Sequence, residues 1–175
     1  MKKVRPSPRE STAFHEAGHA VVGHLLSWHI DVITIKATEY FRGYILRRKR
    51  QAIPGIVDYD IKKGERPDDR PLADRLTLLY AGIVAQRLLC IQRGVSSKPV
   101  RLGRDIREAR DSVRNLSKEK QIELLDSAEK QAMKLLADPQ NWQILERIAA
   151  ELLKSGTLDG PSLLKLLPET QYVIF

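Results

Sequence analysis

Two histidines and a glutamate near the start of the chain have the spacing of a metal site. His15 and His19 lie four residues apart in the segment TAFHEAGHAVVGHLL, with Glu16 between them. On a helix, residues four apart lie one turn above each other, so both imidazoles can reach one ion while Glu16 lies about a quarter turn away. The pattern therefore predicts a divalent-metal centre, with zinc as the expected ion.

This chemistry needs a helix, and the surrounding sequence predicts one from about Pro8 to Trp28. Ser7 and Glu10 form a capping-box pattern with Pro8 at the first helical position, and no further proline occurs before Trp28. Apolar residues cover most of the helix surface, so we expect it to be buried. Two imidazoles and a carboxylate in a buried helix need partners, which a bound cation would provide.

A catalytic zinc has three protein ligands and one open position, so one more donor must come from elsewhere. His24 projects away from His15, and His29 lies nearly four turns along the helix, so both are interpreted as structural. The metzincin extension is excluded because its glycine and histidine positions are Val22 and Leu25. Spacing alone leaves these carboxylates open as the third ligand: Glu65, Asp68, Asp69, Asp74, Asp105 and Glu108.

Composition limits the class of protein. The chain has 175 residues, a formal net charge of +8 and a single cysteine, Cys90, so it fits one domain and has no intrachain disulfide. No apolar run reaches the roughly eighteen residues that a membrane span needs, and the N-terminus has no signal-peptide core. We therefore expect a soluble, cytoplasmic protein.

The positive charge is concentrated in two places. A row of arginines between residues 101 and 114 is interleaved with acidic residues, which is typical of a solvated helix face. The second cluster makes binding to nucleic acid or an anionic surface an alternative function, which ranks last because no aromatic-rich recognition motif accompanies it. It comprises Arg47, Arg48, Lys49 and Arg50.

The remaining patterns predict an α+β domain that is mainly helical and has a small β-sheet or hairpin. Alternating residues over 31–37 predict a strand, and residues 41–50 predict its hairpin partner. Residues 1–6 are expected to be a disordered lead-in, and residues 51–71 a flexible active-site loop. Further helices are expected over 72–92, after Gly103 from Asp105 through Leu116, from Ser117 to about Ala137, from Asp138 to Gly156, and from Asp159 or Gly160 onward.

These segments, taken together, resemble the protease domain of the FtsH-type ATP-dependent zinc proteases. FHEAGHAVVGHLL is followed by DVITIKA, LADRLTLLYAGIVAQRLL, GRDIREAR and LLKSGTLDGPSLLKLL, in the family's order over about residues 8–167. The resemblance implies that Asp105, in GRDIREA, is the third metal ligand beside His15 and His19. It also implies a small sheet whose edge aligns the substrate as an added strand.

The sequence departs from that family in two respects. The family's membrane spans and AAA ATPase domain are not present, and no Walker motif occurs, so the expectation is a stand-alone peptidase-like domain over residues 1–175. A separate ATPase or unfoldase and an oligomeric state are compatible with it. Gln86 and Arg87 stand where the family has carboxylates. The difference affects the residues expected to support the metal ligands and to form subunit contacts, and not the ligands themselves.

The expected function is a zinc-dependent endopeptidase that hydrolyses peptides or unfolded protein segments, with one Zn²⁺ per chain. Zinc would lower the pKa of its bound water and polarise the scissile carbonyl, and Glu16 would act as general base and pass the proton to the leaving amine. The alternative is a proteolytically inactive, zinc-stabilised interaction module, which the missing ATPase and the residues Gln86 and Arg87 motivate.

Overall fold

The computed structural model describes residues 4–28, 30–36, 71–96 and 103–168. The described residues form six helices and a two-stranded antiparallel sheet, which confirms the predicted mainly helical α+β class. The predicted hairpin strand over 41–50, the basic cluster within it, His29 and nearly all of the predicted active-site loop lie outside the described residues.

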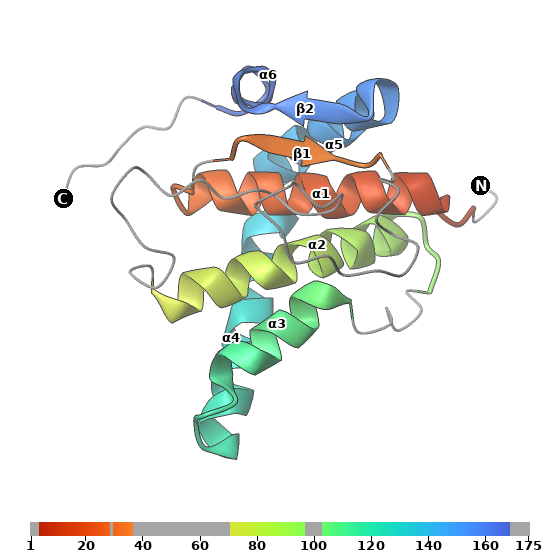
Figure 1. The fold of residues 1–175 in the computed structure, drawn as a ribbon. Helices are drawn as coiled ribbons and strands as arrows, with labels where there is room; N and C mark the ends of the chain where they lie inside the picture. Colours follow the sequence, from red (N-terminus) through yellow and green to blue (C-terminus); the bar gives the residue numbers. More distant parts are fainter. Residues whose placement is uncertain (1–3, 29, 37–70, 97–102, 169–175) are drawn as a thin grey trace, which may run out of the picture.

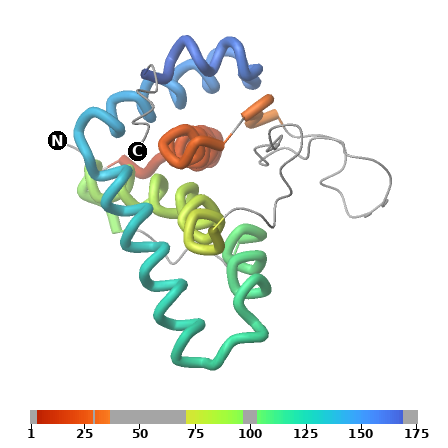
Figure 2. Tube along the Cα trace, turned by 90° about the vertical axis from the view of Figure 1, so that its left-hand side faces the viewer, coloured from red at the N-terminus to blue at the C-terminus, as the bar shows by residue number. Residues whose placement is uncertain are grey.

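Helix α1 (Pro8–Leu25) lies at the centre of this arrangement. Figure 1 shows it between the sheet and the helices α2 and α3, and Figure 2 shows it nearly end-on with the other helices around it. The predicted capping box is present: Ser7 Oγ accepts from the Glu10 amide at 3.2 Å, and the Ser7 amide donates to Glu10 Oε2 at 3.4 Å. The helix therefore begins where the sequence predicts.

The predicted end of this helix at Trp28 was wrong. The last helical residue is Leu25, and Ser27 has a φ of 59°, in the left-handed region that ends a helix. The Trp28 amide then donates to the carbonyl of Gly23 at 2.8 Å. Because this left-handed residue is a serine rather than a glycine, no residue type in the sequence indicated the stop.

Helix α2 (Leu72–Gln92) crosses α1 at very short range. A Cβ built on Gly18 of α1 would lie 2.7 Å from the Cβ of Ala85 and 2.8 Å from the carbonyl oxygen of Ala81. Side chains at the contact set the distance between packed helices, so these small residues let the two backbones come close. Both helices consequently bury nearly all of their middle turns.

Three further helices follow: α3 (Arg104–Val113), α4 (Lys118–Ala137) and α5 (Pro139–Ser155). For α4 and α5 the predicted boundary residues are confirmed: Ser117 and Asp138 accept backbone N–H groups as N-caps, and Gly156 ends α5 with a left-handed φ of 79°. Helix α3 ends at Val113, three residues before the predicted Leu116. Helix α4 packs on α2, and α5 packs on α1. Figure 2 shows α4 and α5 along the same side of the central helix pair.

The sheet joins segments that are far apart in the sequence. Strand β1 (Val32–Thr34) pairs antiparallel with β2 (Thr157–Asp159), with Ile33 opposite Leu158, and helix α6 (Gly160–Leu164) follows directly. The strand predicted over 31–37 is thus shorter than expected. Strand β2 was not predicted, because three residues between two helices carry too little alternation to indicate a strand.

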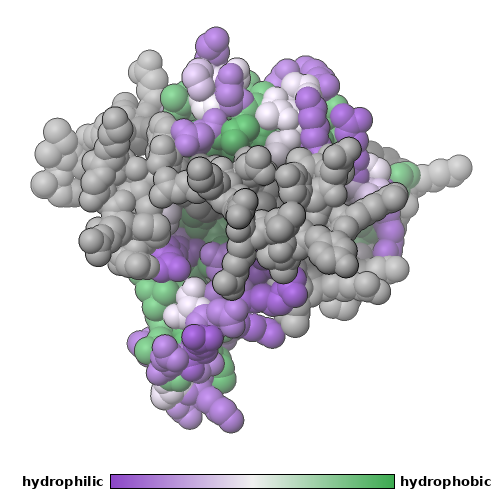
Figure 3. All heavy atoms as spheres, in the orientation of Figure 1, coloured by the Kyte–Doolittle hydropathy of each residue, from purple (hydrophilic) through white to green (hydrophobic). Residues whose placement is uncertain are grey.

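The surface at the α3–α4 end mixes hydrophilic and hydrophobic residues (Figure 3). The exposed residues include Arg104, Arg107, Arg110 and Arg114 of the predicted solvated row. The six ion pairs formed between two described residues include none of these arginines, which fits their expected place on a solvated helix face. No described helix combines the length and apolarity that a bilayer crossing requires.

We expect Ser7→Ala to lower the free energy of unfolding by about 1 kcal/mol, because the mutation removes the oxygen that caps α1. Chemical denaturation followed by circular dichroism measures this change. Ser7→Asp keeps an N-cap acceptor and should retain most of the stability. Equal stability of the alanine and wild-type chains would contradict a contribution of the capping box.

Candidate metal centre

Helix α1 presents three of the predicted site residues from its buried middle. His19 and Glu16 are only 3% and 1% exposed, whereas the His15 side chain keeps 20% of its surface accessible. The histidine rings are one turn apart, with ring centroids separated by 4.7 Å and the planes nearly perpendicular. The helix thus brings the two imidazoles together, as the four-residue spacing predicts.

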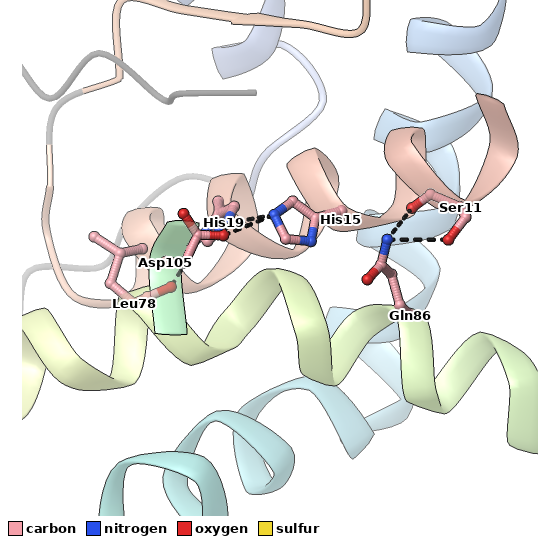
Figure 4. A network of polar contacts seen from close by, with 6 residues as sticks. All are labelled: Ser11, His15, His19, Leu78, Gln86 and Asp105. Atoms are coloured by element: carbon pink, nitrogen blue, oxygen red, sulfur yellow. Dashed lines mark hydrogen bonds and ion pairs between the residues drawn. The ribbon is translucent and has the colours of Figure 1, made fainter. Parts of the chain in front are cut away.

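Asp105 comes to these histidines from the first turn of α3. Its Oδ2 atom lies 3.0 Å from Nε2 of His15 and 3.5 Å from Nε2 of His19 (Figure 4). The buried residues of α3 are Ile106, Ala109 and Val113, which anchor the helix while Asp105 remains 20% exposed at its side chain. Of the candidate carboxylates, Asp105 is the one that the described structure places in a group with both histidines.

A hydrogen bond from His19 to a backbone carbonyl determines which of its two ring nitrogens carries the proton. Nδ1 lies 2.9 Å from the carbonyl oxygen of Leu78 on α2, and a carbonyl can only accept, so Nδ1 carries the proton. In the neutral ring, Nε2 then has a free lone pair. It lies 3.1 Å from Nε2 of His15. Two imidazole nitrogens and a carboxylate oxygen therefore converge on a single point.

The donor set fits a tetrahedral divalent ion. Zinc binds imidazole nitrogen at about 2.0–2.1 Å, which places neighbouring ligand atoms about 3.3 Å apart around a tetrahedral ion. The three separations here are 3.0, 3.1 and 3.5 Å. Two neutral imidazoles and one carboxylate also match the ligand types that zinc takes in hydrolases. The residues could hold such an ion with little rearrangement.

The ionisation of Asp105 supports its role as an anionic donor. Burial on its own would raise the pKa of the carboxyl group, but the adjacent imidazoles of His15 and His19 hold it well below its usual range. Asp105 also lies in the first turn of α3, where the helix dipole favours negative charge. The carboxylate is consequently charged at neutral pH.

The pKa of Glu16 is shifted in the opposite direction to that of Asp105. Burial raises its pKa to about 7, the neighbouring His15 lowers it and Asp105 raises it. Its Oε2 atom is buried and has no hydrogen-bond partner among the described residues. A buried carboxyl oxygen without a partner is costly, and strongly perturbed pKa values cluster at functional sites. Glu16 is thus near the cluster without belonging to it.

The other candidate residues do not join this cluster. His24 lies 3.1 Å from the carbonyl oxygen of Pro168, and burial lowers its pKa while that bond raises it, which fits the predicted structural role. Asp74 and Glu108 are outside the three-residue group. The remaining carboxylates proposed from spacing lie outside the described residues: Glu65, Asp68 and Asp69.

One member of the site was missed from the sequence, namely the carbonyl of Leu78. Every residue type has a backbone carbonyl, so no residue pattern could indicate this contact. A helix over 72–92 was predicted, but the position of one carbonyl opposite His19 depends on how the two helices cross. This information is available only from the folded arrangement.

Gln86 and Arg87 have partners away from the histidines. The Gln86 amide donates to the carbonyl oxygen of Ser11 at 3.1 Å and to its Oγ at 3.0 Å, which ties α2 to the first half of α1 (Figure 4). Arg87 forms an ion pair with Glu129 of α4. Both residues therefore connect helices, and neither contacts the three converging donors.

Comparison with known proteins finds similarity to bacterial zinc metalloproteases. The chain is 33% identical over 110 residues, 62% of its length, to the ATP-dependent zinc metalloprotease FtsH of Haemophilus influenzae. It is 28% identical over 205 aligned positions, covering 95% of the chain, to FtsH 3 of Symbiobacterium thermophilum. The FtsH of Photobacterium profundum is 32% identical over 109 residues.

The similarity is weak and covers a part of these relatives. The chain spans 14–30% of the length of the three relatives. No family model matches it. The comparisons therefore support an FtsH-like relationship at low identity.

We expect Gln86→Glu to destabilise the fold by about 1 kcal/mol or more, because a carboxylate cannot donate to the Ser11 carbonyl and would leave it facing a negative charge. The measurement is the free energy of unfolding. Gln86→Ala removes the donor without adding charge and should cost less. A glutamate variant as stable as the wild type would show that the amide bond does not hold the helices together.

Proposed function

We propose that the chain is a metal-dependent peptidase in which His15, His19 and Asp105 hold one zinc ion. The observation that carries the proposal is the convergence of three donor atoms within 3.5 Å of one another. The similarity to proteins named zinc metalloproteases supports zinc as the ion. When bound, a divalent ion supplies Lewis acidity, which polarises a peptide carbonyl and makes water a better nucleophile at neutral pH.

In this proposal Glu16 is the general base. Hydrolysis joins the oxygen of water to the carbonyl carbon and breaks the C–N bond, so one proton must move from water to the leaving nitrogen. A carboxyl group with a pKa of about 7 can both accept and return that proton near neutral pH. The unpartnered Oε2 atom leaves Glu16 available for it, since no described residue occupies that oxygen.

The sheet suggests how an extended substrate would be aligned. Ile33 is paired with Leu158, and the flanking bonds join Ile35 N to Gly156 O and Gly160 N to Asp31 O. The backbone N–H and C=O groups of residues 31, 33 and 35 thus face β2, and those of Val32 and Thr34 are directed to the other edge. We place an extended peptide or unfolded protein segment along that edge, as an added strand.

Glu16→Gln tests the proposed chemistry. It keeps the shape of the side chain but removes its ability to take a proton, so cleavage of unfolded casein or a quenched fluorescent peptide should fall by about 100- to 10,000-fold. Metal content should stay near the wild-type value. The matched control is Glu119→Gln on the exposed start of α4, which should cleave normally. A chain that holds metal but shows no Glu16-dependent cleavage would instead be a metal-stabilised interaction module.

Asp105→Asn tests the proposed ligand set. Mutation of a residue that only orients a metal ligand lowers metal affinity about 10- to 100-fold. Because Asp105 is proposed to be a ligand itself, Asp105→Asn should lower zinc affinity by more than that. Elemental analysis of protein purified without added metal, followed by titration of the chelated chain with zinc, measures the change. Asp111→Asn, exposed on the same helix, is the control. Near-stoichiometric zinc in the Asp105→Asn chain would rule out this carboxylate as a ligand.

A further inference from the structure

The two histidines of the cluster are oriented by different means. The Nδ1 atom of His19 is held by the carbonyl of Leu78, the usual way in which a metal-binding imidazole is fixed. The polar contacts of His15 are both made by Nε2, with Asp105 and His19. In the described part of the chain, no residue forms a hydrogen bond with Nδ1 of His15. The described residues therefore hold this ring by hydrogen bonds at Nε2 alone, and packing must position the rest of it.

Gly82 of α2 lies directly against the His15 ring. A Cβ built on Gly82 would have Cε1, Nδ1 and Nε2 of His15 as its three nearest neighbours, all at 2.6 Å or less. Real Cβ atoms essentially never come closer than 3.0 Å to such neighbours. The ring thus occupies the space that any other residue at position 82 would fill with its side chain. Gly82 is buried in the middle of α2, where glycine is otherwise unfavourable for a helix.

We propose that Gly82 is a positioning residue of the metal centre: its missing side chain lets the His15 ring lie against α2 with Nε2 directed at His19 and Asp105. The inference rests on the proposed function, which it deepens. A side chain at position 82 would push the ring away from α2, and His15 has no other described contact on Nδ1 that could restore its direction. His19, held by Leu78, would keep its own orientation.

The test is a double-mutant cycle with Gly82→Ala and His15→Ala, measuring zinc affinity and, in metal-free protein, the melting temperature. Gly82→Ala alone should lower zinc affinity at least about 10-fold. In the His15→Ala chain the ring is gone, so the added methyl group has room. There Gly82→Ala should leave the residual affinity unchanged and should not lower the melting temperature, since alanine favours the helix.

Gly18→Ala is the matched control because it is the same substitution at the same helix crossing. Its Cβ would meet Ala81 and Ala85 rather than a histidine. It should lower the melting temperature by a similar amount whether or not His15 is present. The dependence on His15 therefore separates a positioning role of Gly82 from general overpacking between α1 and α2.

Each outcome decides the inference. If Gly82→Ala does not fold but the double variant does, the clash is with the His15 ring and the inference is supported. If Gly82→Ala harms the His15→Ala chain as much as the wild type, the inference is overturned. If the wild-type chain binds zinc through His15 and the Gly82→Ala chain binds it equally well, the inference is rejected and the proposed function stands. A wild-type chain without zinc affinity rejects the proposed function as well.

Discussion

The close crossing of α1 and α2 is the constraint on which the candidate site depends. Gly18, Ala81 and Ala85 leave no room for larger side chains where the helices meet. Because protein interiors are close-packed, the residues at a crossing determine how near the two backbones come. This short distance brings the carbonyl of Leu78 within 2.9 Å of His19. The small residues thus act on the site indirectly, by placing a backbone acceptor where an imidazole needs one.

The same packing explains why the site is electrostatically unusual. An apolar helix between two others has little water around it, so its polar groups must find partners within the protein. His19 finds the Leu78 carbonyl and Asp105 finds both imidazoles, whereas the Oε2 atom of Glu16 has no described partner. The burial that costs stability also brings the pKa of Glu16 to about 7. A solvent-exposed glutamate at that position would be ionised far below neutral pH and would be a poorer proton carrier.

Local signals in the sequence were sufficient to predict most of the helices and the proximity of the two histidines. The capping residues Ser7, Ser117 and Asp138 each begin a helix as predicted, because capping depends on neighbouring residues. The spacing of His15 and His19 predicted their proximity for the same reason.

Contacts between distant segments were not predictable in this way. Strand β2 exists because it pairs with β1 more than a hundred residues earlier in the chain, and three residues carry no pattern of their own. Spacing in the sequence left six carboxylates as candidates for the third ligand. Asp105 was selected among them by the family resemblance and not by a physical argument. The donor set exists only when α3, a short helix with Ile106, Ala109 and Val113 as its buried residues, docks on its neighbours. An ion that binds this set and not the unfolded chain would stabilise that docking by mass action, so its binding and the placement of α3 would form one coupled equilibrium.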